Sequence, residues 1–370
     1  MKETLRYLVG MAGPSGYGSK SSAEQVTEHL QCSSPLTAII TGATSGIGEE
    51  TARVLAKRGV RIVMAARDMK KAAKVRERIK RGGPEAEILM SEIDLSSLAS
   101  VRRFCMEFAA LGLPLNILIN NGGVFSPNLE YSDDKLELTF ATNYLGHYLL
   151  TELLLDKLIE TSRRTGIQGR IINVSSVVHC WVKKDDLCFT HLLNPNKYNG
   201  TRAYAQSKLA CILHAKEVAR QLKVILLLQL LRFLQTVDKT VHILKFQPFL
   251  QERDANVTIN AVHPGIPSSA SSTSTKRKMY KRLLIYHNYI LTSLADSLFF
   301  MASKLLKSIP QGAATTCYVA LSPQTHRKTG RYFADCNETK CSSLANDELA
   351  ARTLWIQTRA LILRELGEPV

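Results

Sequence analysis

An apolar run that leads directly into spaced glycines constrains the fold of this chain more than any other feature. Leu36 to Ile40 has the composition of a parallel strand that is buried on both faces. The turn that follows reads Thr41-Gly42-Ala43-Thr44-Ser45-Gly46-Ile47-Gly48, and a helix is predicted after it. Gly42 permits a tight turn, and Gly46 and Gly48 let the backbone approach a pyrophosphate at the helix N-terminus, where free N–H groups favour an anion. This order predicts a dinucleotide-binding unit, although the spacing is Gly-x-x-x-Gly-x-Gly and not the commoner Gly-x-Gly-x-x-Gly.

The end of the second predicted strand, Val60 to Ala65, indicates which dinucleotide would bind. An acidic residue there would bind the ribose 2′-hydroxyl of NAD, whereas an arginine accommodates the 2′-phosphate of NADP. Arg67 therefore favours NADP over NAD. Asp68 has a different role, as the N-cap of the basic helix predicted from Met69 to Arg81. Asp94, after the third strand, can hydrogen-bond an adenine edge or cap the next helix, and the two roles are compatible.

Four more strands are predicted, and helical segments separate them. They cover Glu87 to Ile93, Leu115 to Ile119, Arg170 to Val174 and Val257 to Val262. This alternation predicts an α/β fold with a single Rossmann-type, doubly wound parallel sheet and helices on both faces. Sites in such sheets lie at the carboxyl ends of the strands. The residues at these ends are Gly42, Arg67, Asp94, Asn120, Ser176 and Pro264, so we expect them to line one crevice.

Two long predicted helices carry further candidate site residues. One runs from about Asp133 to Glu160 and contains Asn143, and the other runs from Tyr204 to about Lys223. Tyr204 and Lys208 are four residues apart, on one helix face. A lysine beside a phenol favours the phenolate and lowers the phenol pKa, so that the tyrosine can exchange a proton with a substrate oxygen near neutral pH. The alternative is a solvated helix face with chance spacing, and the predicted nucleotide turn and Ser176 favour the catalytic interpretation.

Composition excludes several other classes of function. The net charge of +16 favours acidic partners such as a phosphate-bearing cofactor, or it is a solvated basic surface. No nucleic-acid motif accompanies the charge, so no nucleic-acid partner is predicted. The eight cysteines form no Cys-x-x-Cys pair, so no metal site is predicted, and we interpret them as reduced, mostly buried cysteines of an intracellular protein. Residues 1–35 lack the apolar core of a signal peptide and are predicted to be partly helical and partly loose.

The motifs resemble those of the short-chain dehydrogenase/reductase family. Four motifs follow the family's order between about residues 36 and 335, and these are Thr41-Gly42-x-x-x-Gly46-x-Gly48, Asn120-Asn121-Gly122-Gly123, Ser176 with Tyr204-x-x-x-Lys208, and Pro264-Gly265. Asn143-Tyr-Leu-Gly-His, the long loop after Ser176 and Tyr204-Ala-Gln-Ser-Lys-Leu-Ala look like the retinol-dehydrogenase-like branch. The chain is more similar still to the plant group of short-chain dehydrogenases that is associated with the translocon of the chloroplast inner envelope.

The resemblance implies an NADP(H)-dependent enzyme that transfers hydride between nicotinamide and a carbonyl or alcohol substrate, which we expect to be apolar. Tyr204 would be the general acid or base, Lys208 would hold the nicotinamide ribose, and Ser176 would polarise the substrate oxygen. Asn143 would maintain a water path to Lys208. The implied cofactor contacts are Gly42, Thr44, Ser45, Gly46, Ile47, Gly48, Arg67, Asp94, Leu95, Asn121, Gly122, Tyr204, Lys208, Pro264 and Gly265.

Two segments depart from the family's pattern. Val224 to Leu250 is inserted, and its Leu-rich start is shorter than the ~20 residues that span a bilayer. The insert could extend the helix, lie on a membrane, bind a partner or be a foreign segment from an unspliced message. In the substrate lid, residues 266–310, Ser269 only partly replaces the threonine that usually contacts the nicotinamide amide. The basic cluster Lys276 to Arg282 in this lid is compatible with calmodulin, with an anionic membrane surface or with simple solvation.

We therefore predict an N-terminal extension (1–35), a dehydrogenase domain (36–335) and a C-terminal helical extension (336–370). The leading hypothesis is an oxidoreductase. The alternatives are an NADP-responsive regulatory protein of a membrane complex and an inactive splice variant. The resemblance suggests the chloroplast inner envelope, with the cytoplasm as the other location, and it allows a homodimer because helices that flank the catalytic tyrosine often form the family's dimer interface.

Overall fold

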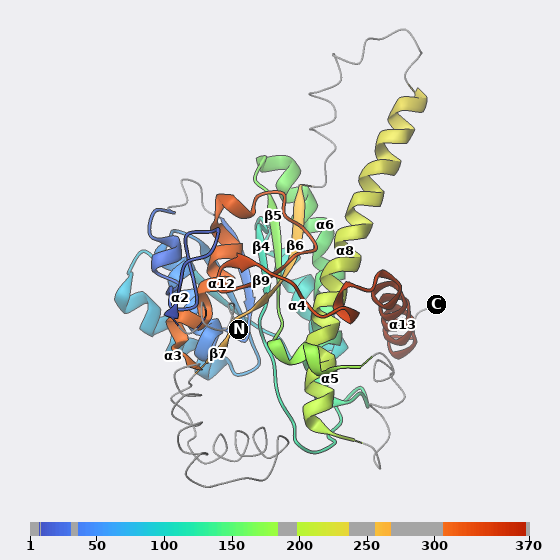
Figure 1. Cartoon of the computed structure of the whole chain (residues 1–370), viewed down its shortest axis with the longest axis horizontal. Coiled ribbons are helices and arrows are strands. Elements are labelled where there is room, and N and C mark those ends of the chain that lie inside the picture. Colours follow the sequence, from blue (N-terminus) through green and yellow to red (C-terminus); the bar gives the residue numbers. More distant parts are fainter. Residues whose placement is uncertain are drawn as a thin grey trace.

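A computed structural model describes Tyr7 and residues 9–30, 36–183, 198–236, 256–267 and 306–367, with only the backbone for residues 224–236, 266, 267 and 306. An eight-stranded sheet runs through the molecule in the order β10-β9-β6-β5-β4-β1-β2-β3 (Figure 1). Its strands are β1 (Thr37–Thr41), β2 (Arg61–Ala66), β3 (Ile88–Glu92), β4 (Ile117–Asn120), β5 (Gly169–Val174), β6 (Val257–His263), β9 (Tyr332–Ala334) and β10 (Asn337–Glu338). Every neighbouring pair is parallel except β9 and β10. The predicted doubly wound parallel sheet is confirmed, and β9 and β10 are additions that the sequence analysis missed.

Helices cover both faces of the sheet, which explains why the β1 segment is apolar without alternation. Ala38 and Ile40 point into one core, against α2 (Gly46–Lys57), α3 (Met69–Gly82) and α12 (Ile309–Leu321). Ile39 points into the opposite core, which is closed by α4 (Leu98–Ala110), α6 (Gly146–Thr165) and α8 (Gly200–Thr236). Burial on both faces therefore requires an apolar side chain at successive positions.

The helix predicted from Asp133 to Glu160 begins later than expected. The chain forms the short α5 (Leu138–Phe140), a π-helical turn η2 (Ala141–Leu145) and then α6. The acidic residues before α5 cap helices instead of continuing one. The Glu137 carboxylate accepts hydrogen bonds from the first free N–H groups of α5, and Asp134 accepts one from the first residue of α4. The predicted start at Asp133 was therefore wrong.

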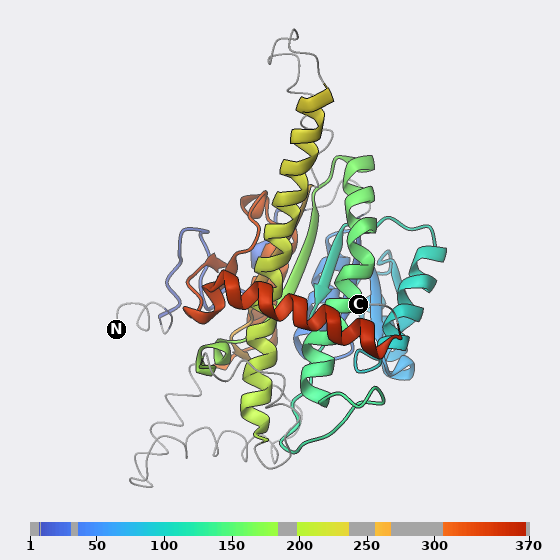
Figure 2. The same cartoon turned by 90° about the vertical axis from the view of Figure 1, so that its right-hand side faces the viewer.

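The Tyr204 helix is longer than predicted. α8 does not end near Lys223 but continues to Thr236, and its last turns project beyond the body of the molecule in both views (Figures 1 and 2). No Gly or Pro interrupts residues 224–236, and leucine is a good helix former, so the first half of the insert extends the helix. The rest of the insert, residues 237–250, lies outside the described residues. So do Ser269, which was expected to replace in part the threonine that contacts the nicotinamide amide, and the basic cluster Lys276 to Arg282. In the described part of the chain, no helix combines the length and apolarity needed to span a membrane.

The C-terminal helix α13 (Glu348–Glu365) lies within the predicted C-terminal helical extension and packs across α8, as Figure 2 shows. Its Thr358 hydroxyl lies 3.0 Å from the buried Tyr144 hydroxyl of η2. Its Trp355 ring lies against the Tyr148 ring of α6, with centroids 6.5 Å apart. The outer face of α6 and α8 is thus covered by the chain's own C-terminal helix.

The N-terminal segment is not loose over residues 9–30. Ala23 and Val26 are buried in the core on the α12 side, and the Ala23 N–H donates to the Pro310 carbonyl at 2.8 Å. Asn337 of β10 donates its side-chain amide to the Tyr17 carbonyl. The segment therefore closes the edge of the sheet near β10, and the prediction of a partly loose extension was wrong for these residues.

Candidate active site

The glycine turn after β1 is shaped by close backbone contacts and leaves one side open. A Cβ on Gly48 would collide with the Gly42 carbonyl oxygen and the Asn121 side chain, and one on Gly42 (φ +64°) would lie 2.7 Å from Gly122 Cα. Gly46 has φ +56°, and no atom lies within 4 Å of the position that a Cβ would occupy there. Positive φ favours glycine, and open space at the N-terminus of α2 leaves room for an anion. The turn therefore fits the pyrophosphate of a dinucleotide.

Thr41 connects this turn to α6. Its Oγ1 accepts the N–H groups of Asn121 and Gly122, both at 2.9 Å, and lies 2.8 Å from His147 Nε2. His147 Nδ1 lies 3.0 Å from the Asn143 carbonyl, which can only accept, so Nδ1 carries the proton and the Thr41 hydroxyl donates to Nε2. Burial lowers the pKa of His147 to about 4, so the ring is neutral at pH 7. His147 was not among the predicted site residues, although its place in Asn143-Tyr-Leu-Gly-His was a usable signal.

Asn143 lies in the π-helical turn η2 and is fully buried. Its Oδ1 accepts the Val124 N–H at 2.8 Å, and its Nδ2 donates to the Val124 carbonyl and to Ser207 Oγ, both at 3.0 Å. Both ends of the side chain are therefore fixed, one toward the loop after β4 and the other toward α8. π-turns inside helices are frequent at functional sites.

The two serines after β5 have different environments. Ser175 is buried, and its hydroxyl donates to the Lys208 carbonyl at 2.7 Å. Lys208 Nζ donates to the Val174 carbonyl at 2.9 Å, so these two bonds attach α8 to the end of β5. Ser176 is only half-buried, and its Oγ is 3.5 Å from the Val178 N–H. Tyr204, also half-buried, has Lys208 Nζ 5.6 Å from its ring centroid.

At the end of β2, Arg67 is 73% exposed and contacts the Asp94 carboxylate only at 3.9 Å. Asp68 accepts a hydrogen bond from a backbone N–H of α3, so its predicted role as N-cap is confirmed. The N-cap of α4 is Ser97, whereas Asp94 accepts the N–H and hydroxyl of Ser96 in the preceding turn. The capping role considered for Asp94 is therefore wrong, and its second oxygen faces the arginine.

Leu95 and the Pro264-Gly265 turn border the same edge of the sheet. Leu95 lies against Gly122, where an added Cβ would be 2.8 Å from its Cδ1. Gly265 has φ +80° and packs on the aliphatic stem of Lys307, whose ammonium pairs with Asp335 at 2.5 Å. Lys307 is buried, and no local pattern in the sequence marks it. Together with the turn and the β5 end, these residues occupy the edge that parallel α/β sheets use for ligands.

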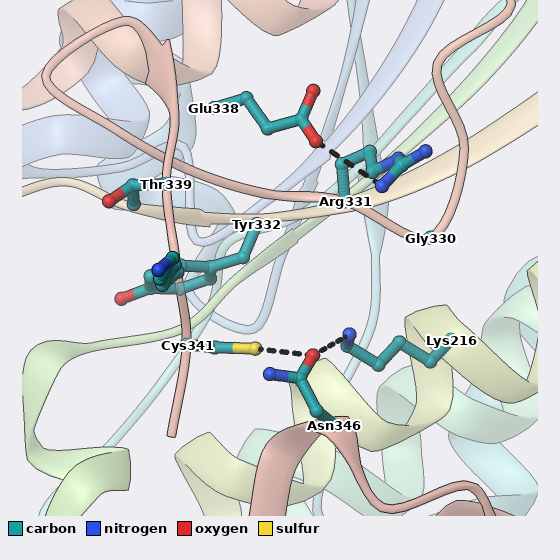
Figure 3. Close-up of a pocket in the computed structure, with 9 residues that line it drawn as sticks. Lys216, Gly330, Arg331, Tyr332, Glu338, Thr339, Cys341 and Asn346 are labelled. Atoms are coloured by element: carbon teal, nitrogen blue, oxygen red, sulfur yellow. Dashed lines mark hydrogen bonds and ion pairs between the residues drawn. The ribbon is translucent and has the colours of Figure 1, made fainter. Parts of the chain in front are cut away.

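A separate groove of about 390 Å³ lies beside β9 (Figure 3) and is lined by Lys216, Gly330, Arg331, Tyr332, Glu338, Thr339, Lys340, Cys341 and Asn346. Lys216 of α8 and Cys341 both contact Asn346 Oδ1, at 2.5 and 3.3 Å. These contacts attach the segment after β10 to α8. The groove does not include the residues of the predicted site.

The sheet, the glycine turn and the β5–α8 junction define a short-chain dehydrogenase, and the chain belongs to the short-chain dehydrogenase/reductase family. The family profile described as short chain dehydrogenase matches residues 36–182. The relatives include Short-chain dehydrogenase TIC 32 A, chloroplastic, from Brassica napus, which is 42% identical over 95% of this chain and 96% of its own length.

A further relative and a solved structure extend the comparison. Human retinol dehydrogenase 14 is 35% identical over 86% of this chain and 84% of its own length. L-sorbose reductase from Gluconobacter frateurii, solved with NADPH and L-sorbose, superposes with a TM-score of 0.54 at 18% identity, over 81% of this chain and 95% of that chain. The last similarity concerns the fold alone. The predicted resemblance to the plant translocon-associated group and the retinol-dehydrogenase-like branch is confirmed.

Proposed function

We propose that this protein is an NADP(H)-dependent oxidoreductase that acts on an apolar carbonyl or alcohol substrate. The observation that carries the proposal is the junction of β5 and α8. The Ser175–Lys208 and Lys208–Val174 bonds hold the α8 turn that follows Tyr204 against the end of β5, and the half-buried Ser176 comes directly after this point in the chain. Membership of the family supports a nicotinamide cofactor, which supplies or accepts the hydride when bound.

The protein's own groups then move the proton and orient the substrate. In the reductive direction, the Tyr204 hydroxyl donates its proton to the substrate oxygen, and Ser176 donates a hydrogen bond to that oxygen. The Lys208 ammonium, 5.6 Å from the tyrosine ring, stabilises the phenolate that remains. We assign Asn143 to the water path that returns a proton toward Lys208, because its side chain already joins the β4 loop to α8.

Two further features support the finer details of the proposal. The exposed Arg67 guanidinium, with one long contact to Asp94, is free to bind a 2′-phosphate and favours NADP over NAD. Two accessible aromatic side chains near this part of the site are apolar. Phe125 stacks edge-on against Tyr204 at 5.9 Å and is 39% exposed, and Trp181, on the turn after Ser176, is half-exposed. Such a surface favours an apolar substrate.

The test is oxidation of NADPH, followed by absorbance, with a panel of aliphatic and aromatic aldehydes and ketones. Tyr204→Phe should lower kcat by about 10²- to 10⁴-fold, the usual contribution of a general acid. Its affinity for NADPH should stay unchanged. No turnover with any member of the panel, together with no effect of the substitution, would contradict the proposal.

A second function is favoured by the projecting end of α8 and by the name of the Brassica napus relative, TIC 32 A, chloroplastic. On this proposal the protein is an NADP-responsive regulatory component of a membrane complex at the chloroplast inner envelope. The Leu-rich end of α8 would contact the membrane complex. Alternatively, the basic segment of the lid would bind an anionic membrane surface or calmodulin. Binding to anionic vesicles or calmodulin should then change with NADPH and persist in Tyr204→Phe. Binding that ignores the cofactor would contradict this second function.

We propose that the insert at residues 224–250 interrupts one dehydrogenase domain (36–335), and one deletion tests this and the splice-variant alternative. Soluble expression and NADPH binding are compared for the full chain and for a chain that lacks residues 224–250. Binding only after deletion would identify the full chain as inactive. A homodimer through α6 and α8 is disfavoured because α13 occupies that face, and the mass in solution by light scattering tests this.

A further inference from the structure

A buried histidine joins the substrate serine to the C-terminal part of the chain. His179 lies in the short turn η3 (Val177–Trp181) and is 1% exposed. Its Nδ1 is 2.6 Å from the Ser176 carbonyl oxygen, and its Nε2 is 3.2 Å from the backbone nitrogen of Ser342. The ring also packs edge-on against Tyr332 of β9, with centroids 5.1 Å apart. One partner of this bridge is three residues away in the chain and the other is 163 residues away.

The partners of His179 determine its tautomer. The Ser342 N–H can only donate, so Nε2 must be the unprotonated acceptor. The Ser176 carbonyl can only accept, so Nδ1 carries the proton. Burial lowers the pKa of His179, which favours this neutral form. The ring is therefore a directional link between two backbone groups, and the Cys180 thiol, with Sγ 3.4 Å from Nε2, is a second donor to the unprotonated nitrogen.

The Ser342 end of the link is itself anchored. Cys341, the residue before Ser342, contacts Asn346 Oδ1 at 3.3 Å, and Lys216 of α8 contacts the same oxygen at 2.5 Å (Figure 3). The link thus rests on α8, the helix that also carries Tyr204.

The consequence for Ser176 follows from its place as N-cap of η3. An N-cap hydroxyl normally accepts a backbone N–H through its oxygen, and this bond fixes the orientation of the side chain. Here the only such contact of Ser176 Oγ within the described residues is a long one, 3.5 Å from the Val178 N–H. The turn is held instead through the Ser176 carbonyl, which accepts both the His179 N–H at 3.2 Å and the imidazole Nδ1–H. The Ser176 hydroxyl therefore remains available for a substrate oxygen.

We propose that His179 is a positioning residue that fixes the Ser176 turn against the C-terminal segment and leaves the serine hydroxyl free for the substrate. The inference rests on the proposed oxidoreductase function, because Ser176 has its role there. It adds that the chain after β10 is part of the catalytic support and not an appendage.

Two substitutions separate the two ends of the link. In His179→Asn the side-chain amide can reproduce the Nδ1–H donor to Ser176 but cannot reach Ser342. In His179→Gln the amide oxygen can reproduce the Nε2 acceptor for Ser342 but leaves the Ser176 carbonyl without its donor. We expect His179→Gln to lower kcat about tenfold and His179→Asn to lower it less than threefold, with NADPH affinity unchanged in both. Hydrogen exchange of the Ser342 amide should show the opposite order, with protection kept in His179→Gln and lost in His179→Asn.

The wild-type tautomer gives a readout that does not need turnover. Selective ¹⁵N-histidine labelling, with the resonance assigned from the variants, should show a neutral ring with protonated Nδ1. A protonated Nε2 would overturn the proposal. It would also be overturned if the two variants lost kcat equally and in proportion to their losses of thermal stability. If the wild-type protein reduces no substrate, the proposed function fails, while the tautomer and the exchange data still decide whether the link exists.

Discussion

The two ends of the candidate site are held together in different ways. We call the β1–β4 end, with Thr41, Asn121 and His147, the cofactor edge, and the β5–β9 end, with Ser176 and His179, the substrate edge. Hydrogen bonds of the cofactor edge join residues at most 106 positions apart, and all of them fall within the segment that matches the family profile. The substrate edge depends on Ser342, 163 positions beyond His179.

This difference indicates where the chain can tolerate change. The hydrogen bonds of the cofactor edge all join residues that precede α8, so the insert at residues 224–250 does not interrupt them. The substrate edge is completed only by Asp335 and Ser342, which follow both long departures from the family pattern, and by Lys307 near the end of the second. We therefore expect changes in the chain after α8 to affect the substrate edge more than the cofactor edge.

The strongest effect is expected from a change that disrupts the cofactor edge alone. In Gly48→Ala the new methyl group would meet the Gly42 carbonyl and the Asn121 side chain, and backbone cannot move away cheaply. We expect NADPH to bind at least about 100-fold more weakly, or about 2.7 kcal/mol, by fluorescence titration. The protection of the Ser342 amide should remain, because the substrate edge does not use this turn.

Gly82→Ala is the matched control for this substitution. Gly82 ends α3, has no positive φ, and has no atom within 4 Å of an added Cβ. The NADPH affinity of Gly82→Ala should equal that of the wild-type protein. Equal affinity in both variants would show that the close approach at Gly48 does not shape the cofactor site.

The next effect concerns buried neutral histidines and is read as stability against pH. Burial lowers the pKa of His147 to about 4 and that of His214 to about 3. The unfolded chain takes up these protons near pH 6.5 and the folded chain does not, so stability is full above that pH and is lost as pH falls toward 4. Each ring contributes up to about 1.4 kcal/mol per pH unit. Partial burial raises the pKa of the half-buried Glu152, which partly offsets this loss.

Urea unfolding at pH 7, 6 and 5 measures the slope of the free energy of unfolding against pH. Two histidine variants show which residues cause this slope. His214→Phe, which removes a ring packed between Tyr144 and Tyr148, should reduce the slope by about 1.4 kcal/mol per pH unit. His326→Gln, at an exposed histidine, should leave the slope unchanged. A slope that is the same in all three proteins would mean that other groups cause the acid sensitivity.

A smaller effect refines the description of the cofactor edge. Arg67→Ala should raise the dissociation constant of NADPH about tenfold, or about 1.4 kcal/mol, and leave that of NADH unchanged. Thermal stability should barely change, because the Arg67–Asp94 contact is long and exposed. Arg103→Ala, at another exposed arginine near the end of β3, is the control and should affect neither dinucleotide. Equal weakening of NADPH and NADH would contradict the proposed preference.

The same contrast explains what the sequence could predict. β1 was predicted as Leu36 to Ile40 and is Thr37–Thr41, because a run buried on both faces and a glycine turn are local signals. The roles of Ser175 and Lys307 were out of reach, since a hydroxyl bonded to a helix carbonyl and a lysine stem against Gly265 depend on residues far apart in the chain. The π-turn around Asn143 was also missed, because a helical pattern does not distinguish π from α spacing.

The weakest effect is expected at the C-terminal helix and tests how firmly it supports the site. Thr358→Val keeps the side-chain shape but removes the hydroxyl that lies 3.0 Å from the Tyr144 hydroxyl. The Tyr144 hydroxyl then loses this partner while Tyr144, next to Asn143 in the chain, stays buried. An unsatisfied buried hydroxyl costs about 1 kcal/mol or somewhat more, so the free energy of unfolding in urea should fall by about that amount. Thr353→Val, on the exposed face of α13, should change the free energy of unfolding by less than about 0.5 kcal/mol.

The Thr358→Val variant also allows a comparison of kcat. Since Tyr144 adjoins Asn143 and not Ser176, kcat should fall less in Thr358→Val than in His179→Gln. A larger fall in Thr358→Val would mean that α13, through η2, supports catalysis more than the histidine link does.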